Sequence, residues 1–472
     1  MKVAKLSLAA VVVVAAGFVS NAFAADTLLD AFKNGKVSGE LRAYYFDRDT
    51  GVANPAIYTT GSIGKGDSSI FNTGIVLGYI TDSLYGFKLG ATFQSNYAPF
   101  ASDDAKNVFA GSDMYGSGAV LSEAYINYKI GKTDIKIGRQ FIGAPISPLV
   151  WNSGSRMIKE SFEGATVINK DLPDTTLMAG YITKFQARTT TAIDGYNIGT
   201  KTVLGSDSKI PDFEKIIFIT KGAGSAVKQS SGRYAKSGST FSFDGAYTAS
   251  IINTSIPSLT LTGQYLQIND IANIADASVY YTEANYLLPV GNLKWAFDVM
   301  FRGSTTDDAL DAYNLEGTYI GVRTGIKEWN GLGATIAYGQ TSKEDAVLGG
   351  MGNGIYTYTT TLIRGPGNSL DKNSKGWLFE LTYDFEKVGV KGLSFLGIYC
   401  VANLNDNETI SSTGKAVSLV DIDYTTKTAA LYYEIPNVKG LKIGIEYETQ
   451  EKDDGKSKVD TDEYRLRAQY KF

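Results

Sequence analysis

The chain has no histidine and a single cysteine, Cys400, among its 472 residues. Without histidine it can form neither a Ser-His-Asp or Cys-His catalytic arrangement nor a metal site with a histidine ligand. One cysteine also excludes an internal disulfide. Two acidic segments, 102–107 and 403–408, carry the oxygen groups that calcium prefers, but they lack a regular ligand spacing. We therefore expect a protein that is not an enzyme and that holds no metal and no cofactor.

Long apolar runs are absent after the first 24 residues. Lys2 and Lys5 precede a short apolar stretch that ends in a small-x-small site at residues 22–24, which predicts a signal peptide over residues 1–24. No later segment reaches the roughly 18 apolar residues of a membrane helix. Without the two signal lysines, the 45 basic residues fall to 43 against 49 acidic ones, a net charge of −6. There is no basic tail, so nucleic acid is not an expected partner.

Apolar and polar residues alternate with a period of two, which is typical of strands with one apolar and one polar face. The C-terminal segment 462–472 shows the pattern most clearly. Its apolar face holds Tyr464, Leu466, Ala468, Tyr470 and Phe472, and its polar face holds Arg465, Arg467, Gln469 and Lys471. The same alternation predicts about 18 strands, at residues 36–46, 72–82, 84–95, 118–130, 133–140, 161–170, 174–186, 238–252, 257–267, 277–288, 292–302, 315–328, 330–341, 374–386, 391–402, 421–434, 439–449 and 462–472.

The lengths of the connections decide between a soluble sandwich and a membrane barrel. Connections of a few residues alternate with longer ones, which are expected at 47–71, 96–117, 141–160, 187–237, 268–276, 303–314, 342–373, 403–420 and 450–461. This alternation is typical of a bacterial outer-membrane barrel, with short periplasmic turns and long extracellular loops. We therefore predict an all-β fold, a transmembrane antiparallel β-barrel of about 18 strands formed by residues 25–472.

Proline is scarce, and its placement agrees with a barrel. None of the 10 prolines lies in the interior of an expected strand: four fall in short turns or, as Pro257 does, at the boundary of one, and six fall in long loops. The turn prolines are Pro173, Pro257, Pro289 and Pro436, and the loop prolines are Pro55, Pro99, Pro145, Pro148, Pro211 and Pro366. Proline removes a ladder hydrogen bond that lipid cannot replace, so a closed barrel requires such a placement.

The third long connection, residues 141–160, differs from the other connections. A barrel of about 18 strands is too wide for its inward side chains to fill, so another segment must narrow it. Pro145 and Pro148 stiffen this loop, and Trp151 and Met157 provide apolar anchors against the wall. We expect the loop to fold inward as the constriction of a pore.

Two runs in this region, "GRQFIGAPISPLVWNSGSRMIKESFEG" and "LMAGYITKFQARTT", resemble the OprD-type substrate-specific outer-membrane porins. Arg156 matches an arginine of the third loop in that family, 162–164 match the opening of the next strand, and 184–188 match the end of the strand after it. The resemblance implies a narrow constriction, a ladder of basic residues on one wall, and uptake of small solutes that commonly bear a carboxylate. It also implies the outer membrane of a Gram-negative bacterium.

The strand faces indicate which charges point inward. Arg42 shares the polar face of the first strand, and closure of the barrel places this strand beside the last, whose polar face carries Arg465 and Arg467. These three arginines form an expected basic stripe. Other inward charges include Arg323 and Lys327 on one strand, Lys294, Asp298 and Arg302 on its neighbour, and Glu123 on an early strand.

Each of these charges has a simpler interpretation. An inward charge on a barrel strand is by default a solvated wall residue, and Arg156 has a structural alternative in a salt bridge to Glu160 or Glu163. With the basic stripe facing the path, we expect a porin that passes small hydrophilic solutes with a preference for carboxylate-bearing or dipolar ones. The alternative is a structural or adhesive barrel whose lumen is plugged by segment 187–237. The other expected partners are outer-membrane lipid and lipopolysaccharide, and the sequence leaves monomer and homotrimer open.

Overall fold

The computed structural model describes residues 25–51, 68–110, 114–190, 208–218, 226–228, 234–236, 240–352, 354, 356–363, 370–411 and 415–472. The expected signal peptide, residues 1–24, lies outside the described residues, as do Pro55, Pro366 and much of segment 187–237.

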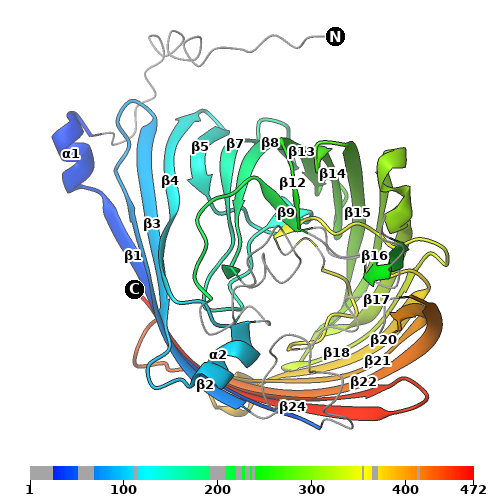
Figure 1. Cartoon of the computed structure of the whole chain (residues 1–472). Coiled ribbons are helices and arrows are strands. Elements are labelled where there is room, and N and C mark those ends of the chain that lie inside the picture. Colours follow the sequence, from blue (N-terminus) through cyan, green and yellow to red (C-terminus); the bar gives the residue numbers. More distant parts are fainter. Residues whose placement is uncertain are drawn as a thin grey trace.

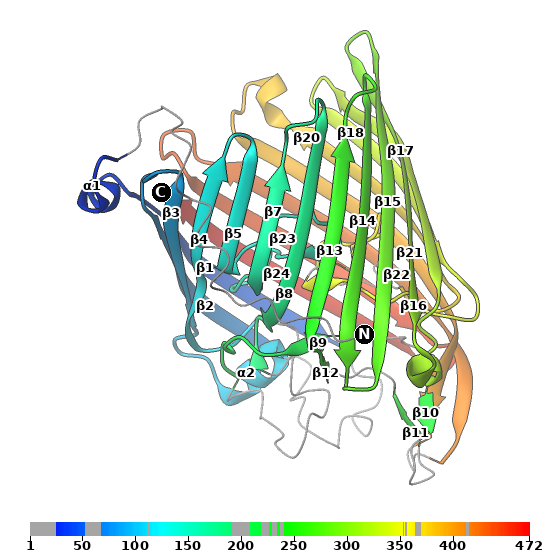
Figure 2. The same ribbon diagram turned by 90° about the horizontal axis from the view of Figure 1, so that it is seen from above.

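Eighteen strands pair in chain order into one antiparallel sheet, and the first strand pairs with the last, so the sheet closes into a barrel (Figure 1 and Figure 2). The barrel strands are β1 (Lys36–Thr50), β2 (Ser68–Ile80), β3 (Phe87–Tyr97), β4 (Gly118–Ile130), β5 (Thr133–Gln140), β7 (Ser161–Asn169), β8 (Thr175–Gln186), β13 (Gly245–Asn253), β14 (Leu259–Ile271), β15 (Ala275–Val290), β16 (Leu293–Thr306), β17 (Thr318–Trp329), β18 (Leu332–Thr341), β20 (Ser374–Asp384), β21 (Leu393–Ile410), β22 (Val417–Glu434), β23 (Leu441–Asp453) and β24 (Lys458–Lys471). The predicted number of strands and the antiparallel barrel are confirmed.

Shorter elements lie in the connections. They are α1 (Leu28–Lys33), α2 (Asp103–Ala110), β6 (Val150–Trp151), β9 (Ile216–Phe218), β10 (Ala226–Lys228), β11 (Tyr234–Lys236), β12 (Thr240–Ser242), β19 (Met351–Gly352) and the 3-10 helices η4 (Asp308–Tyr313) and η6 (Phe385–Val388). Of these, β6 and β19 pair with each other and join two long loops that are far apart in the sequence.

Three of the expected long connections are wrong. Residues 268–276, 403–420 and 450–461 contract to the short segments 272–274, 411–416 and 454–457, because the strands on either side continue toward the outer rim. The period-two pattern weakens where these strands leave the lipid, since both faces then meet water. The sequence therefore underestimates how far the strands extend.

The expectation that no proline lies inside a strand is wrong at Pro289, which lies in β15 opposite Lys294 of β16. The pairing of β15 with β14 ends at Tyr286, so past that residue β16 is the only described strand that pairs with β15. A proline is tolerated at such an edge because no neighbouring strand needs its missing N–H.

The two faces of the barrel wall follow the sequence alternation. On β16, Phe297, Val299 and Phe301 are exposed on the outer face, and Asp298 and Arg302 are buried on the inner face. This apolar outer surface is what a bilayer requires of a barrel. Among the described residues, no helix is long and apolar enough to cross a membrane.

The lumen contains packed side chains as well as polar groups. Tyr44 and Phe46 of β1 form one buried cluster with Phe109 of α2 and with Met157 of the third loop. At the start of this loop the chain passes close to its neighbour: Gly138 has φ of 124°, and a Cβ atom there would lie 2.2 Å from the carbonyl oxygen of Ala124. Only glycine fits this close approach of β5 to β4.

Candidate permeation path

The third loop, residues 141–160, leaves β5 and crosses the lumen before it enters β7. Its strand β6 lies parallel to β19, and the Met351 N–H donates to the carbonyl oxygen of Leu149 at 2.8 Å. β19 belongs to the long connection 342–373 between β18 and β20. Two outer loops therefore meet inside the barrel (Figure 1).

The far side of the third loop is bonded to the wall at β14. The Leu149 N–H donates to Gln264 Oε1 at 2.6 Å, and Gln264 Nε2 donates to Ser147 Oγ at 2.8 Å. Leu149, Ser147 and Gln264 are all buried. A single glutamine thus satisfies polar groups of the loop that have left the sheet, as buried polar atoms require.

The returning half of the loop is held by the basic stripe. Arg42 Nη1 donates to the carbonyl oxygens of Arg156 and Met157 at 2.9 and 2.8 Å, and Arg467 Nη1 donates to the carbonyl oxygen of Ser155 at 3.0 Å. Two arginines from adjacent strands therefore bind three consecutive carbonyl groups. Their positions on the inner face agree with the sequence prediction.

Carboxylates offset the charge of the stripe. Arg42 forms an ion pair with Glu40 at 2.8 Å, and Arg467 forms one with Glu446 at 3.0 Å. Arg465, the third predicted member, has no exposed side-chain surface and pairs with Glu463 at 2.7 Å. The structure brings Arg42 and Arg467 to the loop, whereas Arg465 is buried with its guanidinium 5.3 Å from the ring centre of Phe46.

Arg156 lies in the middle of this contact, where its backbone carbonyl is bound and its side chain is half-buried. The two carboxylates expected as its alternative partners form ion pairs with other cations: Glu160 pairs with Arg188, and Glu163 pairs with Arg139 and Lys184.

Lys159 is a cation of the loop that the sequence reasoning missed. Its side chain is 24 % exposed, and its Nζ atom lies 3.9 Å from Glu40 Oε2. Burial and the nearby Arg42 guanidinium lower the pKa of Lys159 below its ordinary value. The signal available in the sequence was its position three residues after Arg156.

Glu123, another predicted residue, anchors the beginning of the loop. Its carboxylate accepts hydrogen bonds from Thr92 Oγ1 at 2.6 Å and from the Phe141 N–H at 3.1 Å. It therefore fixes the point where the third loop leaves the wall.

A second inward loop, residues 342–373, was not predicted. The buried Arg302 donates to the carbonyl oxygens of Gly354 and Tyr356 at 2.7 and 3.0 Å. The Ile363 N–H donates to Glu448 on the other side of the lumen at 3.1 Å. Glycine and hydroxyl residues crowd the run 347–361, "VLGGMGNGIYTYTTT", and this composition was the available signal.

Arg323 and Asp298, which the sequence places separately on the inner face, lie together on the wall beside this second loop. The two side chains form an ion pair at 2.7 Å, and the Arg323 guanidinium lies 4.3 Å from the ring centre of Tyr358. The Tyr358 hydroxyl donates to Glu283 on β15, and burial raises the pKa of this hydroxyl. The pair thus belongs to a network that joins the wall to the loop.

A described part of the fourth loop supports the third. Ile210 packs with Ile158 of the third loop and with Val120 of β4. Asp212 pairs with Arg139 at 3.4 Å. Among the described residues, no three acidic or cysteine side chains converge to hold a metal ion.

The family comparison gives one match that covers most of the chain. The model for "outer membrane porin, OprD family" matches residues 30–472. The comparison with curated proteins finds no match.

Three of the solved structures that match this chain come from two bacteria. The chain is similar to Acinetobacter baumannii OccAB3, with 15% identity and a TM-score of 0.69 over 93% of this chain and 99% of that one. It is also similar to Pseudomonas aeruginosa OccK8 (OprE), with 18% identity and a TM-score of 0.66 over 94% and 99%. A third match, Pseudomonas aeruginosa OccK9 (OpdG), has 14% identity and a TM-score of 0.68 over 94% and 100%. The match of the family model shows that the chain belongs to the OprD family of outer membrane porins of Gram-negative bacteria.

Proposed function

We propose that this porin passes small hydrophilic solutes by diffusion, with a preference for carboxylate-bearing or dipolar ones, through a path narrowed by residues 141–160. The observation that carries the proposal is the position of this loop, which crosses the lumen and is bound by Arg42 and Arg467 of the wall. A loop held across a wide barrel leaves only a narrow route beside it, where every solute passes close to charged side chains.

Charges on two sides of the lumen support the preference for dipolar solutes. On one side, Arg42 of β1, Arg467 of β24 and Lys159 of the third loop lie near the carboxylates of Glu40 and Glu446. The Arg323–Asp298 pair lies on β16 and β17, about half-way round the ring of strands. Fixed charges in a narrow lumen orient a dipolar solute and compensate for the water it loses, whereas an apolar solute gains no such compensation.

We also propose that residues 1–24 are removed on export. Ala25, the first described residue, is buried, and its N–H donates to the carbonyl oxygen of Ser83 in a short turn. We expect the intact mass of the protein purified from outer membranes to correspond to a chain that begins at Ala25. A mass that includes residues 1–24 would contradict removal.

The channel itself is tested in planar bilayers and in liposomes. Purified protein should produce discrete conductance steps, and liposomes should swell faster in solutions of small carboxylates and amino acids than in solutions of neutral sugars of equal size. A correctly folded protein without conductance would instead support the structural barrel with a plugged lumen.

Arg42 and Arg467 are expected to position the third loop as well as contribute charge. Replacing both with Gln removes three hydrogen bonds from charged donors, each worth about 1.5–3 kcal/mol. Single-channel recordings should show a larger, noisier conductance and a reversal potential shifted away from anion selectivity.

Lysine at the same two positions is the matched control. It keeps the charge but lacks the planar fork that reaches several acceptors. The Arg42→Lys/Arg467→Lys variant should therefore be noisy with an unchanged reversal potential. Recordings identical to those of the wild type would show that these arginines do not position the loop.

Arg323 and Asp298 should affect selectivity in opposite directions. Asp298→Asn leaves the Arg323 charge uncompensated and should shift the reversal potential toward anions. Arg323→Gln leaves the Asp298 carboxylate uncompensated and should shift it toward cations. Both shifts are measured as reversal potentials in a salt gradient. If the reversal potential is unchanged in both variants, the pair does not lie on the solute path.

A further inference from the structure

A hollow of about 640 Å³ lies between the third loop and the rim of short turns. Its wall is formed by the inner faces of β3, β4, β5 and β7, and its roof by the beginning of the loop, from Phe141 to Ile146. This space lies on the periplasmic side of the constriction. The contacts of Arg42, Arg467 and Arg323 described above involve none of the residues that line it.

Five lysines line this hollow, together with a single carboxylate, Asp134. They are Lys88, Lys129, Lys132, Lys136 and Lys170. Asp134 accepts a hydrogen bond from Asn127 Nδ2 at 2.6 Å and lies opposite Lys129 in the ladder of β4 and β5. One carboxylate cannot balance five ammonium groups, so the hollow carries a net positive charge.

Several described lysines outside the hollow form ion pairs with carboxylates, as in Lys294 with Glu328, Lys372 with Glu408 and Lys458 with Glu451. None of the five lysines of the hollow takes part in an ion pair with a described carboxylate. Lys136 instead lies 4.3 Å from the ring centre of Tyr125.

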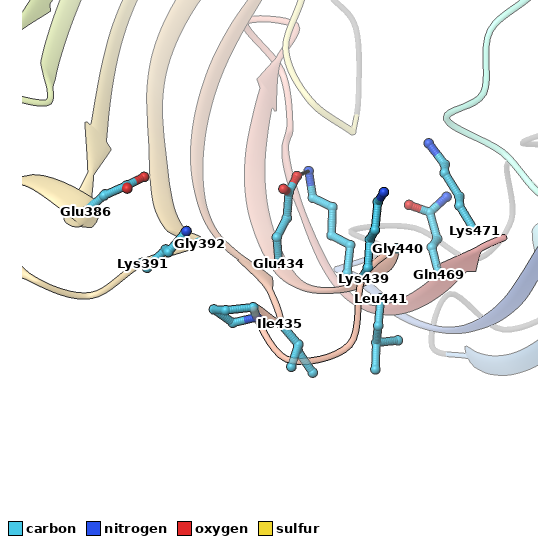
Figure 3. Close-up of a pocket in the computed structure, with 12 residues that line it drawn as sticks. Glu386, Lys391, Gly392, Glu434, Ile435, Lys439, Gly440, Leu441, Gln469 and Lys471 are labelled. Atoms are coloured by element: carbon cyan, nitrogen blue, oxygen red, sulfur yellow. Dashed lines mark ion pairs between the residues drawn. The ribbon is translucent and has the colours of Figure 1, made fainter.

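A second hollow on the same rim provides a comparison. It has a volume of about 580 Å³ and is lined by Lys391, Lys439, Lys442 and Lys471, but also by Glu386 and Glu434 (Figure 3). Lys442 lies 3.9 Å from Glu434. Figure 3 shows Glu434 among the lysine side chains of the turn, so this second hollow is partly neutralised.

We propose that the first hollow binds a small anion with two or more negative charges, as an exit site that solutes reach after the constriction. This inference rests on the proposed channel function. Lysine presents a mobile point charge and no planar fork, so several lysines select for the amount of negative charge more than for the shape of one carboxylate. The concave wall, with Phe141, Ile142 and Met178 in its lining, focuses the field of the lysines.

The test is block of single-channel current by inorganic pyrophosphate, by citrate and by acetate, each added to one side of the bilayer in turn. Pyrophosphate and citrate should bind at least tenfold more tightly than acetate, and more readily from the side of the short turns. The apparent affinity should fall as the salt concentration rises, because salt screens the lysine field. Equal block by acetate would overturn the preference for multiply charged anions. Block by pyrophosphate alone, or by citrate alone, would show that the hollow recognises phosphate or carboxylate groups and not the number of negative charges.

The variant Lys88→Gln/Lys129→Gln/Lys136→Gln should weaken pyrophosphate block at least tenfold while its channels remain open. The control Lys391→Gln/Lys439→Gln/Lys442→Gln removes the same charge from the second hollow and should change the block less than twofold. An equal loss of pyrophosphate block in both variants would indicate that positive charge anywhere around the periplasmic mouth causes the block. That result would refute a specific site in the first hollow. Wild-type channels that conduct but are never blocked would refute the site and leave the channel function intact, whereas absence of conductance would refute the channel function.

Discussion

The closed ladder of backbone hydrogen bonds is the constraint on which the rest of this structure depends. In lipid, each N–H and C=O group must be bonded within the protein, and a barrel meets this requirement because it has no free edge. The pairing of β1 with β24 removes that edge. Closure with 18 strands has a cost, however, because the ring is wider than its inward side chains can fill. The segments that narrow the lumen must therefore come from the loops.

A loop inside the lumen carries polar backbone groups away from the sheet, and these also need partners. Arg42, Arg467 and Arg302 provide them by donating to five carbonyl groups of the two inward loops. Uncompensated guanidinium groups would be costly to bury. Glu40 and Glu446 compensate Arg42 and Arg467 directly. The arginines of the lumen are thus structural connections as well as sources of charge.

The sequence allowed prediction of the features that follow from the period-two alternation. The strand number, the inner face and the adjacency of Arg42 to Arg467 all follow from alternation together with closure. The different environment of Arg465 did not follow, because two residues on one face of a strand differ in height and only one of them meets the loop. The meeting of Val150 with Met351 could not be predicted either, since it depends on the shapes of two loops that have no period. Pro289 shows a related limit, because the end of a ladder depends on the neighbouring strand.

Arginine and lysine have separate roles in this lumen, and their chemistry explains the division. A guanidinium group has five donors in a fixed plane, so it can bind a carboxylate and two carbonyl groups together, as Arg42 does. An ammonium group is compact and strongly hydrated, and it keeps its charge available when no carboxylate lies nearby. In the described lumen, Arg42, Arg467 and Arg302 bind the loops that cross it, and the five lysines of the hollow lie beyond the third loop toward the periplasm. On the proposed path, a solute that passes the arginine contacts next meets these five lysines and the single carboxylate of Asp134.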